Sequence, residues 1–358
     1  MAKPTIHDVA RLAGVSIKTV SRVTNGDSYV AAGTADRVRR AIEELGYLAN
    51  PIARSLRIGR DDAVGLIVES IGDPFFASVI EAVEDAAREA GLFLLIASAG
   101  QTPDQERAAV RGMLNRSVRG LIIVPCHLTY GSERILDRPE NVPVVFADRP
   151  PTDLEADVVM IDNMATGRSA AGHLIAFGHR RIAFVATEVG RYPLSARQAG
   201  YRQALEQHGL AYDPSLVISH HRPDGGEPLL GTALAGPDPA TAVLCGNLLA
   251  SLAVARELHR TKRTDVAMVG IDDFPVADSL DPPITVATQP PELMGRQAFE
   301  LLLGRIAGET SPPRRVVLPT RFIVRGSGEI RHHPAVPEPA AAGGAAEPGP
   351  AVRRTPGA

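Results

Sequence analysis

Apolar runs alternate with amphipathic stretches along most of this chain, and this alternation constrains the fold more than any other feature. Between residues 64 and 147 there are four apolar runs and two helical patterns, at 64–68, 76–90, 92–98, 105–114, 120–124 and 142–147. Between residues 166 and 270 there are three of each, at 166–177, 181–186, 195–208, 242–245, 248–258 and 266–270. Buried strands that alternate with helices are typical of parallel sheets covered on both faces. The repetition predicts two doubly wound parallel-sheet lobes with a cleft between them.

Side chains that directly follow the apolar runs are the candidates for ligand contact. In open parallel sheets, ligands bind beyond the carboxyl ends of the strands. The residues at those places are Asp73 to Phe76, Asp148, Asn247 and Asp272. We expect them to line the cleft between the two lobes.

The first 47 residues have a different pattern, that of three short helices in a separate head. Thr5 is a good N-cap with Asp8 in the capping-box position, and Gly14 stops the first helix. Ser16 can cap a second helix over residues 17–24. Two short helices joined by so tight a turn form a helix-turn-helix. The chain has 358 residues, which is enough for such a head beside a two-lobed body.

The charge distribution distinguishes the head from the rest of the chain. Through residue 60 there are ten Lys and Arg against five acidic residues, a net charge of +5. The whole chain carries −3, so the remaining residues carry −8. A basic head attracts the phosphate backbone of nucleic acids, whereas the acidic remainder repels it. Charged faces are usually only solvated, so charge alone is weak evidence.

Segment 5–25 resembles the LacI/GalR repressor family, whose pattern is roughly T-x-x-D-V-A-x-x-A-G-V-S-x-x-T-V-S-R-V-x-N; here it reads TIHDVARLAGVSIKTVSRVTN. The resemblance implies that the second helix lies in the major groove of DNA and that Ile17, Lys18 and Arg22 contact base edges. Short polar side chains nearby suit contacts to the phosphate backbone. The expected DNA contacts of this second kind are Thr5, Ser16, Thr19, Ser21, Asn25 and Thr34. Ser16 and Asn25 can equally serve as helix-end residues.

The start of the third helix departs from the family pattern. We expect this helix over residues 34–45, but the family's V-S-x-x-T-R is Val30-Ala31-Ala32-Gly33-Thr34-Ala35 here. A cap and a phosphate contact are therefore lost, and one of the three arginines at positions 37, 39 and 40 is the candidate to offset them.

Residues 48–60 resemble the family's hinge segment. Asn50 can cap a short helix and Pro51 suits its first position. The resemblance implies that two such helices of a dimer enter the minor groove, where Leu56 wedges into the central base step. The alternative is that Leu56 packs as an ordinary linker leucine on the body. A helix of about eight residues is marginal alone, so its folding can couple the body to DNA binding.

The body to about residue 325 also resembles the LacI/GalR family, which shares its fold with periplasmic sugar-binding proteins. The stretches that carry the resemblance are DPFFASVIEAVEDAAREAG, SVRGLIIVP, GHLIAFGHRRIAFVA, SARQAGYRQAL, VGIDD and RFIVRGSG. The resemblance implies a small-molecule effector whose contacts are Phe75, Phe76, Asp148, Arg191, Arg197, Asn247 and Asp272. For Asp272 a helix N-cap is the alternative, and for Arg197 a surface ion pair. Arg191 aligns less closely, and a functional and a structural role both stay open.

Other classes of protein find little support in the sequence. No apolar stretch reaches the roughly 20 residues of a membrane span, and no signal-like apolar core follows Met1, so we expect a cytoplasmic protein. Cys126 and Cys245 lie in apolar runs and are expected to be buried free thiols. We find no nucleotide-binding loop, metal-ligand spacing or set of nucleophile, base and orienter, so neither a cofactor, a metal nor an enzyme is expected.

These observations predict a sequence-specific transcriptional regulator, a repressor acting as a homodimer on a near-palindromic DNA operator. Its expected parts are a head (1–47), a hinge (48–60), a two-lobed body that binds the effector (61–330) and a disordered tail (331–358). The tail is rich in Pro, Ala and Gly and lacks a leucine heptad, so tetramerisation is not supported. A sugar is the expected effector; the alternatives are a purine-like metabolite, or a solute-binding protein in place of a regulator.

Overall fold

The computed structural model describes residues 4–24, 29–47, 62–100, 102–127, 142–187, 192–220 and 229–332. Its first part is a head of three helices, α1 (Ile6–Ala13), α2 (Ile17–Thr24) and α3 (Ala32–Leu45). One small apolar core joins them, built from Val9, Ala10, Ala13, Val20, Val38 and Ala41. The expected hinge helix and most of the tail, with Asn50, Leu56 and residues 333–358, lie outside the described residues.

Local hydrogen bonds explain why the first two helices start and stop where they do. The backbone N–H and the hydroxyl of Thr5 both donate to Asp8 Oδ2, at 2.9 and 2.7 Å. Gly14 ends α1 with φ of 65°, a left-handed conformation that glycine adopts without a steric penalty. The Ser16 hydroxyl then accepts from the backbone N–H of Thr19 at 3.1 Å, which caps α2. The predicted helix-turn-helix is confirmed.

The third helix starts earlier than the sequence predicted. It begins at Ala32, not Thr34, because the Ala31 carbonyl already accepts from the N–H groups of Thr34 and Ala35, at 2.9 and 3.0 Å. Ala31 caps it without any side-chain hydrogen bond, so the expected loss of a cap is real. Arg39 pairs with Asp36 at 2.7 Å, one turn along the same helix.

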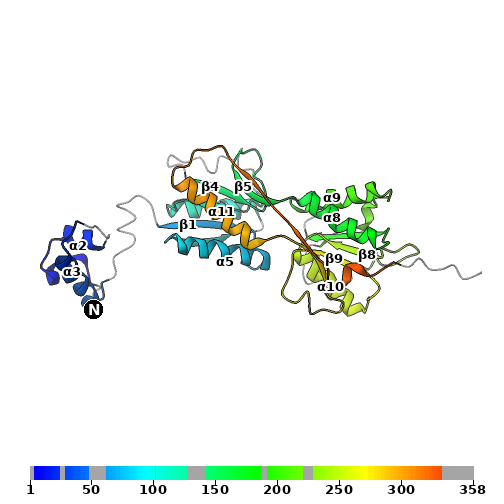
Figure 1. Ribbon diagram of the computed structural model, residues 1–358, viewed down its shortest axis with the longest axis horizontal. Helices are drawn as coiled ribbons and strands as arrows, with labels where there is room; N and C mark the ends of the chain where they lie inside the picture. Colours follow the sequence, from blue (N-terminus) through cyan, green and yellow to red (C-terminus); the bar gives the residue numbers. More distant parts are fainter. Residues whose placement is uncertain are drawn as a thin grey trace, which may run out of the picture.

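The first lobe of the body is a six-stranded sheet in the order β11-β5-β4-β3-β1-β2, with every neighbouring pair parallel. Helices α5 and α11 lie together on one face of it (Figure 1). Its elements are β1 (Ala63–Val68), α5 (Pro74–Glu89), β2 (Phe93–Ser98), α6 (Pro103–Asn115), β3 (Leu121–Ile123), β4 (Val144–Ala147), β5 (Asp157–Ile161), α11 (Pro291–Ile306) and β11 (Arg315–Leu318).

The second lobe is a six-stranded sheet in the order β12-β10-β9-β8-β6-β7. Its elements are α8 (Asn163–Ala176), β6 (Ile182–Thr187), α9 (Leu194–Gln207), the 3-10 turn η1 (Pro214–Leu216), β7 (Val217–His220), β8 (Ala242–Cys245), α10 (Leu248–Thr261), β9 (Ala267–Ile271), β10 (Thr285–Thr288), β12 (Arg321–Ile323) and the 3-10 turn η2 (Ser327–Glu329). The edge strand β12 runs antiparallel to β10, and every other neighbouring pair of this sheet is parallel, as predicted.

The chain passes between the lobes three times, after β5, after β10 and after β11. The last two passages are short, since only residues 289–290 separate β10 from α11 and only residues 319–320 separate β11 from β12; Figure 1 shows the chain crossing between the lobes. Helix α11 and strand β11 thus belong to the first lobe although they follow nearly all of the second. The two-lobed fold is confirmed, and neither lobe is a continuous piece of sequence.

Two further expectations can be compared with the described residues. Cys126 is half-buried, Cys245 is buried, and neither forms a disulfide. Within the described part of the chain, no helix has both the length and the apolar character needed to cross a bilayer.

Candidate functional site

The first candidate site is the exposed face of α2 in the head. Ile17, Lys18 and Arg22 are all exposed, and Lys18 and Arg22 lie one turn apart on the same face. The Ile17 side chain keeps 42% of its surface accessible. The face therefore combines two cationic donors with one apolar group, the combination that major-groove edges require.

The polar residues expected at the DNA backbone flank this face. Ser16 and Thr19 lie at the start of α2, with their hydroxyls 2.9 Å apart, and Ser21 lies in the middle of the helix. Thr5 stands at the start of α1, and Thr34 lies in the first turn of α3. Asn25 lies outside the described residues. The capping alternative for Ser16 is realised.

The second candidate site is a cavity of about 70 Å³ between the two lobes. It contains six of the seven residues expected to contact an effector, namely Phe75, Phe76, Asp148, Arg197, Asn247 and Asp272. The seventh, Arg191, lies outside the described residues. Residues that are far apart in the chain are thus brought together at the carboxyl ends of both sheets.

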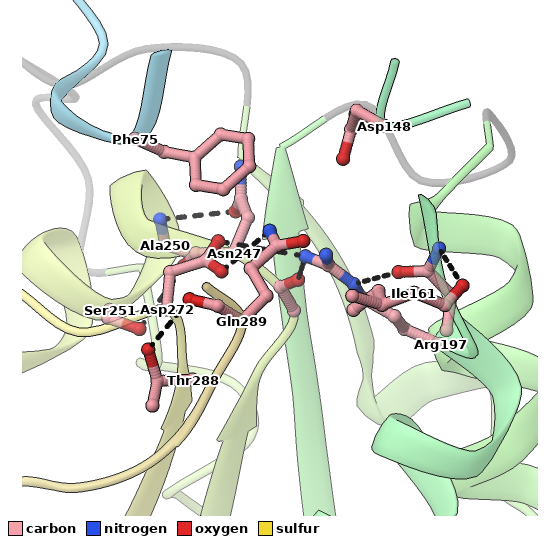
Figure 2. Close-up of polar contacts among 12 residues, drawn as sticks. Phe75, Asp148, Ile161, Arg197, Asn247, Ala250, Ser251, Asp272, Thr288 and Gln289 are labelled. Atoms are coloured by element: carbon pink, nitrogen blue, oxygen red, sulfur yellow. Dashed lines mark hydrogen bonds and ion pairs between the residues drawn. The ribbon is translucent and has the colours of Figure 1, made fainter. Parts of the chain in front are cut away.

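Arg197 is the central cation of this cavity (Figure 2). Only 2% of it is exposed, and its guanidinium donates from Nε to Asn163 Oδ1 and from Nη1 to the Gly246 carbonyl, both at 2.8 Å. Nη1 also lies 3.8 Å from Asp272 Oδ2. The alternative of a surface ion pair is therefore wrong, because the guanidinium is buried and held from three sides.

Close packing of α8 and α9 brings Arg197 to this position. A Cβ on Gly167 would lie 2.1 Å from the Arg197 carbonyl, and a Cβ on Gly200 would lie 2.0 Å from the Met164 carbonyl. The two helices therefore approach so closely that only glycine fits at these two places. Arg197 lies in the first turn of α9, three residues before Gly200, at the end of the helix that faces the cavity.

Asp272 faces Arg197 from the end of β9, in a left-handed backbone conformation with φ of 72°. Its Oδ1 accepts from Gln289 Nε2 at 2.8 Å. Burial raises the pKa of Asp272, while Arg197 and the bond from Gln289 oppose that rise. No helix begins here, so the alternative that Asp272 is an N-cap is wrong.

Asn247 has both the capping role of a helix start and a place in the cavity. Its Oδ1 accepts from the backbone N–H of Ala250 at 3.3 Å, and its Nδ2 donates to Thr187 Oγ1 at 2.8 Å. These contacts fix the amide plane at the cavity wall. The next residue, Leu248, is 1% exposed and adds an apolar side chain to the same wall.

The first lobe contributes a group of charges around the half-buried Arg149. Its guanidinium contacts Glu69 Oε2 and lies 3.1 Å from Asp148 Oδ2. Burial would lower the pKa of Arg149, but the carboxylates of Asp148 and Glu69 raise it. Asp148, only 3% exposed, is thus held by its neighbour with its remaining oxygen available to the cavity.

Asp73 caps α5 at the cavity edge, where its carboxylate accepts from the Phe75 N–H at 2.9 Å. Burial, together with Asp272, Glu69 and Asp148, raises its pKa from 3.8 to about 6. A carboxyl group with a raised pKa binds its proton more tightly in the folded state, so stability falls as the pH rises from about 4 to about 6.

We therefore expect Asp73→Asn to remove this pH dependence, because asparagine also caps helices but carries no charge. Thermal unfolding followed by circular dichroism between pH 4 and pH 8 measures it. The variant should be relatively more stable above pH 6, and the two proteins should converge below pH 4. A wild-type advantage above pH 6 would contradict the raised pKa.

Two polar atoms in the cavity have no hydrogen-bond partner among the described residues, Arg197 Nη2 and Gln289 Oε1. A buried donor or acceptor without a partner costs about 1–3 kcal/mol. Together with Asp148 and Asp272 they offer one donor and several acceptors over a short span. Such a set suits a ligand whose groups both donate and accept, as hydroxyls do.

Several cavity residues were missed by sequence reasoning: Glu69, Arg149, Thr187, Tyr192 and Gln289. Glu69 directly follows β1 and Thr187 ends β6, so the rule of strand ends could have found both. Gln289 follows β10, a strand of four residues that the apolar pattern did not reveal. Among the described residues, no group of three His, Cys, Asp or Glu side chains could hold a metal ion.

Comparison with known proteins agrees with the architecture of both sites. Residues 5–50 match the model of the bacterial regulatory proteins of the lacI family, and residues 171–328 match a periplasmic binding protein-like domain. The chain is 39% identical over 338 residues to the HTH-type transcriptional regulator CelR of Thermobifida fusca, which covers 91% of this chain and 98% of the relative.

Two solved structures extend this comparison. A complex of the transcriptional regulator CelR with cellobiose has 37% identity and a TM-score of 0.66, and it covers 90% of this chain and 99% of its own. A Lac repressor dimer bound to operator and the anti-inducer ONPF has 25% identity and a TM-score of 0.79, with 91% and 99% covered.

Proposed function

Because the chain belongs to the lacI family, whose members are DNA-binding transcriptional regulators, we propose that it is a homodimeric repressor controlled by a carbohydrate in the interlobe cavity. The observation that carries the choice of ligand is the pair of unpartnered buried atoms, Arg197 Nη2 and Gln289 Oε1. A sugar supplies hydroxyls to both. The relative CelR was solved with cellobiose, which agrees with this choice of class.

The first lobe supplies the aromatic groups of the proposed effector site, and the second lobe supplies most of its hydrogen-bonding groups. Phe75 and Phe76 from the first lobe offer ring faces, and they contact each other edge-on with centroids 5.1 Å apart. Arg197, Asp272 and Gln289 from the second lobe offer the hydrogen bonds. A ligand that touches both lobes stabilises their closed arrangement, which gives it different affinities for two states of the protein. That difference is what control of DNA binding requires.

An exposed apolar strand edge supports the proposed dimer. Strand β2 is the last strand of its sheet, with Phe93 74% exposed and Ile96 39% exposed. Long apolar edge strands are rarely left in water. A second copy of the chain that covers them also places two heads on one operator, as two half-sites require. A regulator of this kind acts on chromosomal DNA, so we propose that it works in the cytoplasm. We propose no catalytic role for it.

Operator release by sugars tests the proposal. Operator fragments are first selected from random duplex DNA by the full-length protein, and binding is then followed by fluorescence anisotropy while single sugars are added. We expect one carbohydrate class to change the affinity about 5- to 150-fold, the usual range of such coupling. Asp272→Asn should lose the response but keep DNA binding. If no carbohydrate changes operator affinity and a purine base does, the proposed effector class is wrong.

Arg22→Ala tests the proposed reading face of α2. Loss of a guanidinium that donates to a guanine edge costs about 1–3 kcal/mol of discrimination at one base pair in each half-site. The measurement is a binding-site selection with the variant, and we expect a relaxed preference at that position alone. Arg37→Ala on α3 changes the charge equally and removes at most a phosphate contact, so it can weaken binding overall but should leave the selected base preference unchanged. An unchanged selected motif for Arg22→Ala would refute the assignment.

A further inference from the structure

Asn163 is a buried polar residue at the first passage between the lobes. It is the first residue of α8, directly after the single residue that separates this helix from β5, and only 1% of it is exposed. Among the described residues, it is not one of those that line the interlobe cavity. A buried side-chain amide is costly unless its oxygen and its NH2 group are both hydrogen-bonded. The partners of Asn163 therefore show what it holds together.

The amide oxygen of Asn163 holds the central cation of the proposed effector site. Its Oδ1 accepts from Arg197 Nε at 2.8 Å, and Arg197 lines the cavity from the second lobe. Asp272 lies 3.8 Å from the same guanidinium and accepts from Gln289, which belongs to the second passage. Figure 2 shows Arg197 between Ile161 and Asp272. The two charged groups of the site are thus bonded to residues at two different passages.

The amide nitrogen of Asn163 contacts groups that belong to or pack on the first lobe. Its Nδ2 donates to the Ile161 carbonyl at 3.5 Å and to the Tyr192 hydroxyl at 3.2 Å. Ile161 is the last residue of β5, in the first-lobe sheet. Tyr192 comes just before α9 in the sequence, yet it packs against the apolar cluster around Phe146 of the first lobe. One amide group therefore joins Arg197 of the second lobe to two places on the first lobe.

We infer that Asn163 is a positioning residue through which occupation of the effector site acts on the first lobe. The inference rests on the proposed function, a repressor controlled by a sugar in the interlobe cavity. Arg197 Nη2 has no partner among the described residues, so a sugar hydroxyl that binds it pulls on a guanidinium whose Nε is held by Asn163. The first lobe begins directly after the hinge segment, so a shift of the first passage reaches the side of the body that carries the head. Contacts that differ between two lobe arrangements are what such control requires.

Tyr192→Phe tests this link, and Tyr212→Phe is its matched control. Each substitution removes a hydroxyl that accepts from a side-chain amide, Asn163 Nδ2 at 3.2 Å for Tyr192 and Gln198 Nε2 at 2.9 Å for Tyr212. Tyr212 packs against an apolar cluster of the second lobe, so its bond does not join the lobes. The readout is the ratio of operator affinities without and with saturating sugar, measured by fluorescence anisotropy on the full-length protein. A variant that only binds the sugar more weakly keeps this ratio.

The probe is the sugar that changes the operator affinity of the wild-type protein, beginning with cellobiose. We expect Tyr192→Phe to bring the ratio closer to one by at least about twofold, the smallest contribution expected of one hydrogen bond, and Tyr212→Phe to leave it unchanged. Equal ratios for the two tyrosine variants would overturn the inference and leave the proposed function intact. If no sugar changes the operator affinity of the wild-type protein, both the proposed function and the inference are wrong.

Asn163→Ala removes both sides of the link and should therefore remove most of the response at saturating sugar. Tyr192→Phe should add nothing in that background, because the hydroxyl acts only through the amide, whereas independent effects would add. Circular dichroism verifies that the variant is folded, and if it is not, the two tyrosine variants decide the question. A full response of folded Asn163→Ala at saturating sugar would show that the first lobe senses the effector by another route.

Discussion

Gly200→Ala is expected to destabilise the second lobe by about 3 kcal/mol or more and to abolish the response to the effector. The added methyl would stand 2.0 Å from the Met164 carbonyl and 2.7 Å from the Arg168 nitrogen, both backbone atoms of α8. Backbone atoms within a helix cannot swing aside as a long side chain can. The two helices must therefore separate, which weakens the buried contacts between them and moves Arg197 with α9.

Gly172→Ala is the matched control on the partner helix. Nothing lies within 4 Å of a Cβ built at this position, so the substitution meets no obstacle. Alanine is a better helix former than glycine, and we expect a gain of about 0.5–1 kcal/mol. Urea unfolding followed by circular dichroism compares the two variants, and anisotropy on the operator measures the effector response. If Gly200→Ala changed the stability no more than Gly172→Ala does, the close contact between α8 and α9 at Gly200 would be wrong.

The sequence predicts the fold well where the signal is local. Runs such as 64–68 and 242–245 are long or apolar enough to be read as buried strands, and each became one, β1 and β8. Strands β5, β7, β10, β11 and β12 were not predicted, although some are as long as the predicted β8. Their strand state depends on neighbours in space, since β10 pairs with β9 on one side and β12 on the other.

The residues of the candidate cavity were predictable where they follow a strand with a clear apolar pattern, and not elsewhere. Asp148 and Asp272 each end a strand of clear apolar pattern, so a rule about strand ends places them at the cleft. Gln289 ends a strand that the pattern does not reveal. The close approach at Gly167 and Gly200 has no local signal either, because a glycine in a helix does not tell what faces it. Side chains reached only through tertiary packing are the ones that sequence reasoning missed.

Helix α11 shows this limit most clearly, because an ion pair between the half-buried Arg305 and the buried Asp157 attaches it to a lobe most of whose strands lie far earlier in the sequence. Arg305 near its end donates to both oxygens of Asp157 at 2.6 and 3.0 Å, across 148 positions of sequence. The same carboxylate accepts from the Arg314 N–H at 2.8 Å, just before β11. Asp157 is 3% exposed, so its charge depends on these three bonds.

Asp157→Ala should therefore cost about 3–5 kcal/mol, because it leaves the partly buried Arg305 guanidinium and the Arg314 N–H without their acceptor. Glu206→Ala breaks an exposed pair with Arg202 and is the control, with an expected cost of no more than about 0.5 kcal/mol. Urea unfolding at pH 7 measures both costs. Equal costs would mean that α11 is secured to the first lobe by apolar packing alone.

The pH dependence of this pair gives an independent check of its strength. Burial would raise the pKa of Asp157, but the bonds from Arg305 and Arg314 lower it below its ordinary 3.8. A carboxyl group with a lowered pKa contributes stability that is present above pH 4 and is lost as the pH falls through the folded-state pKa. The difference between wild type and Asp157→Ala should therefore stay constant from pH 7 to pH 5 and shrink below pH 4. Because the pair ties β5 to both α11 and β11, its loss should loosen the passages between the lobes and weaken effector control before the first lobe unfolds.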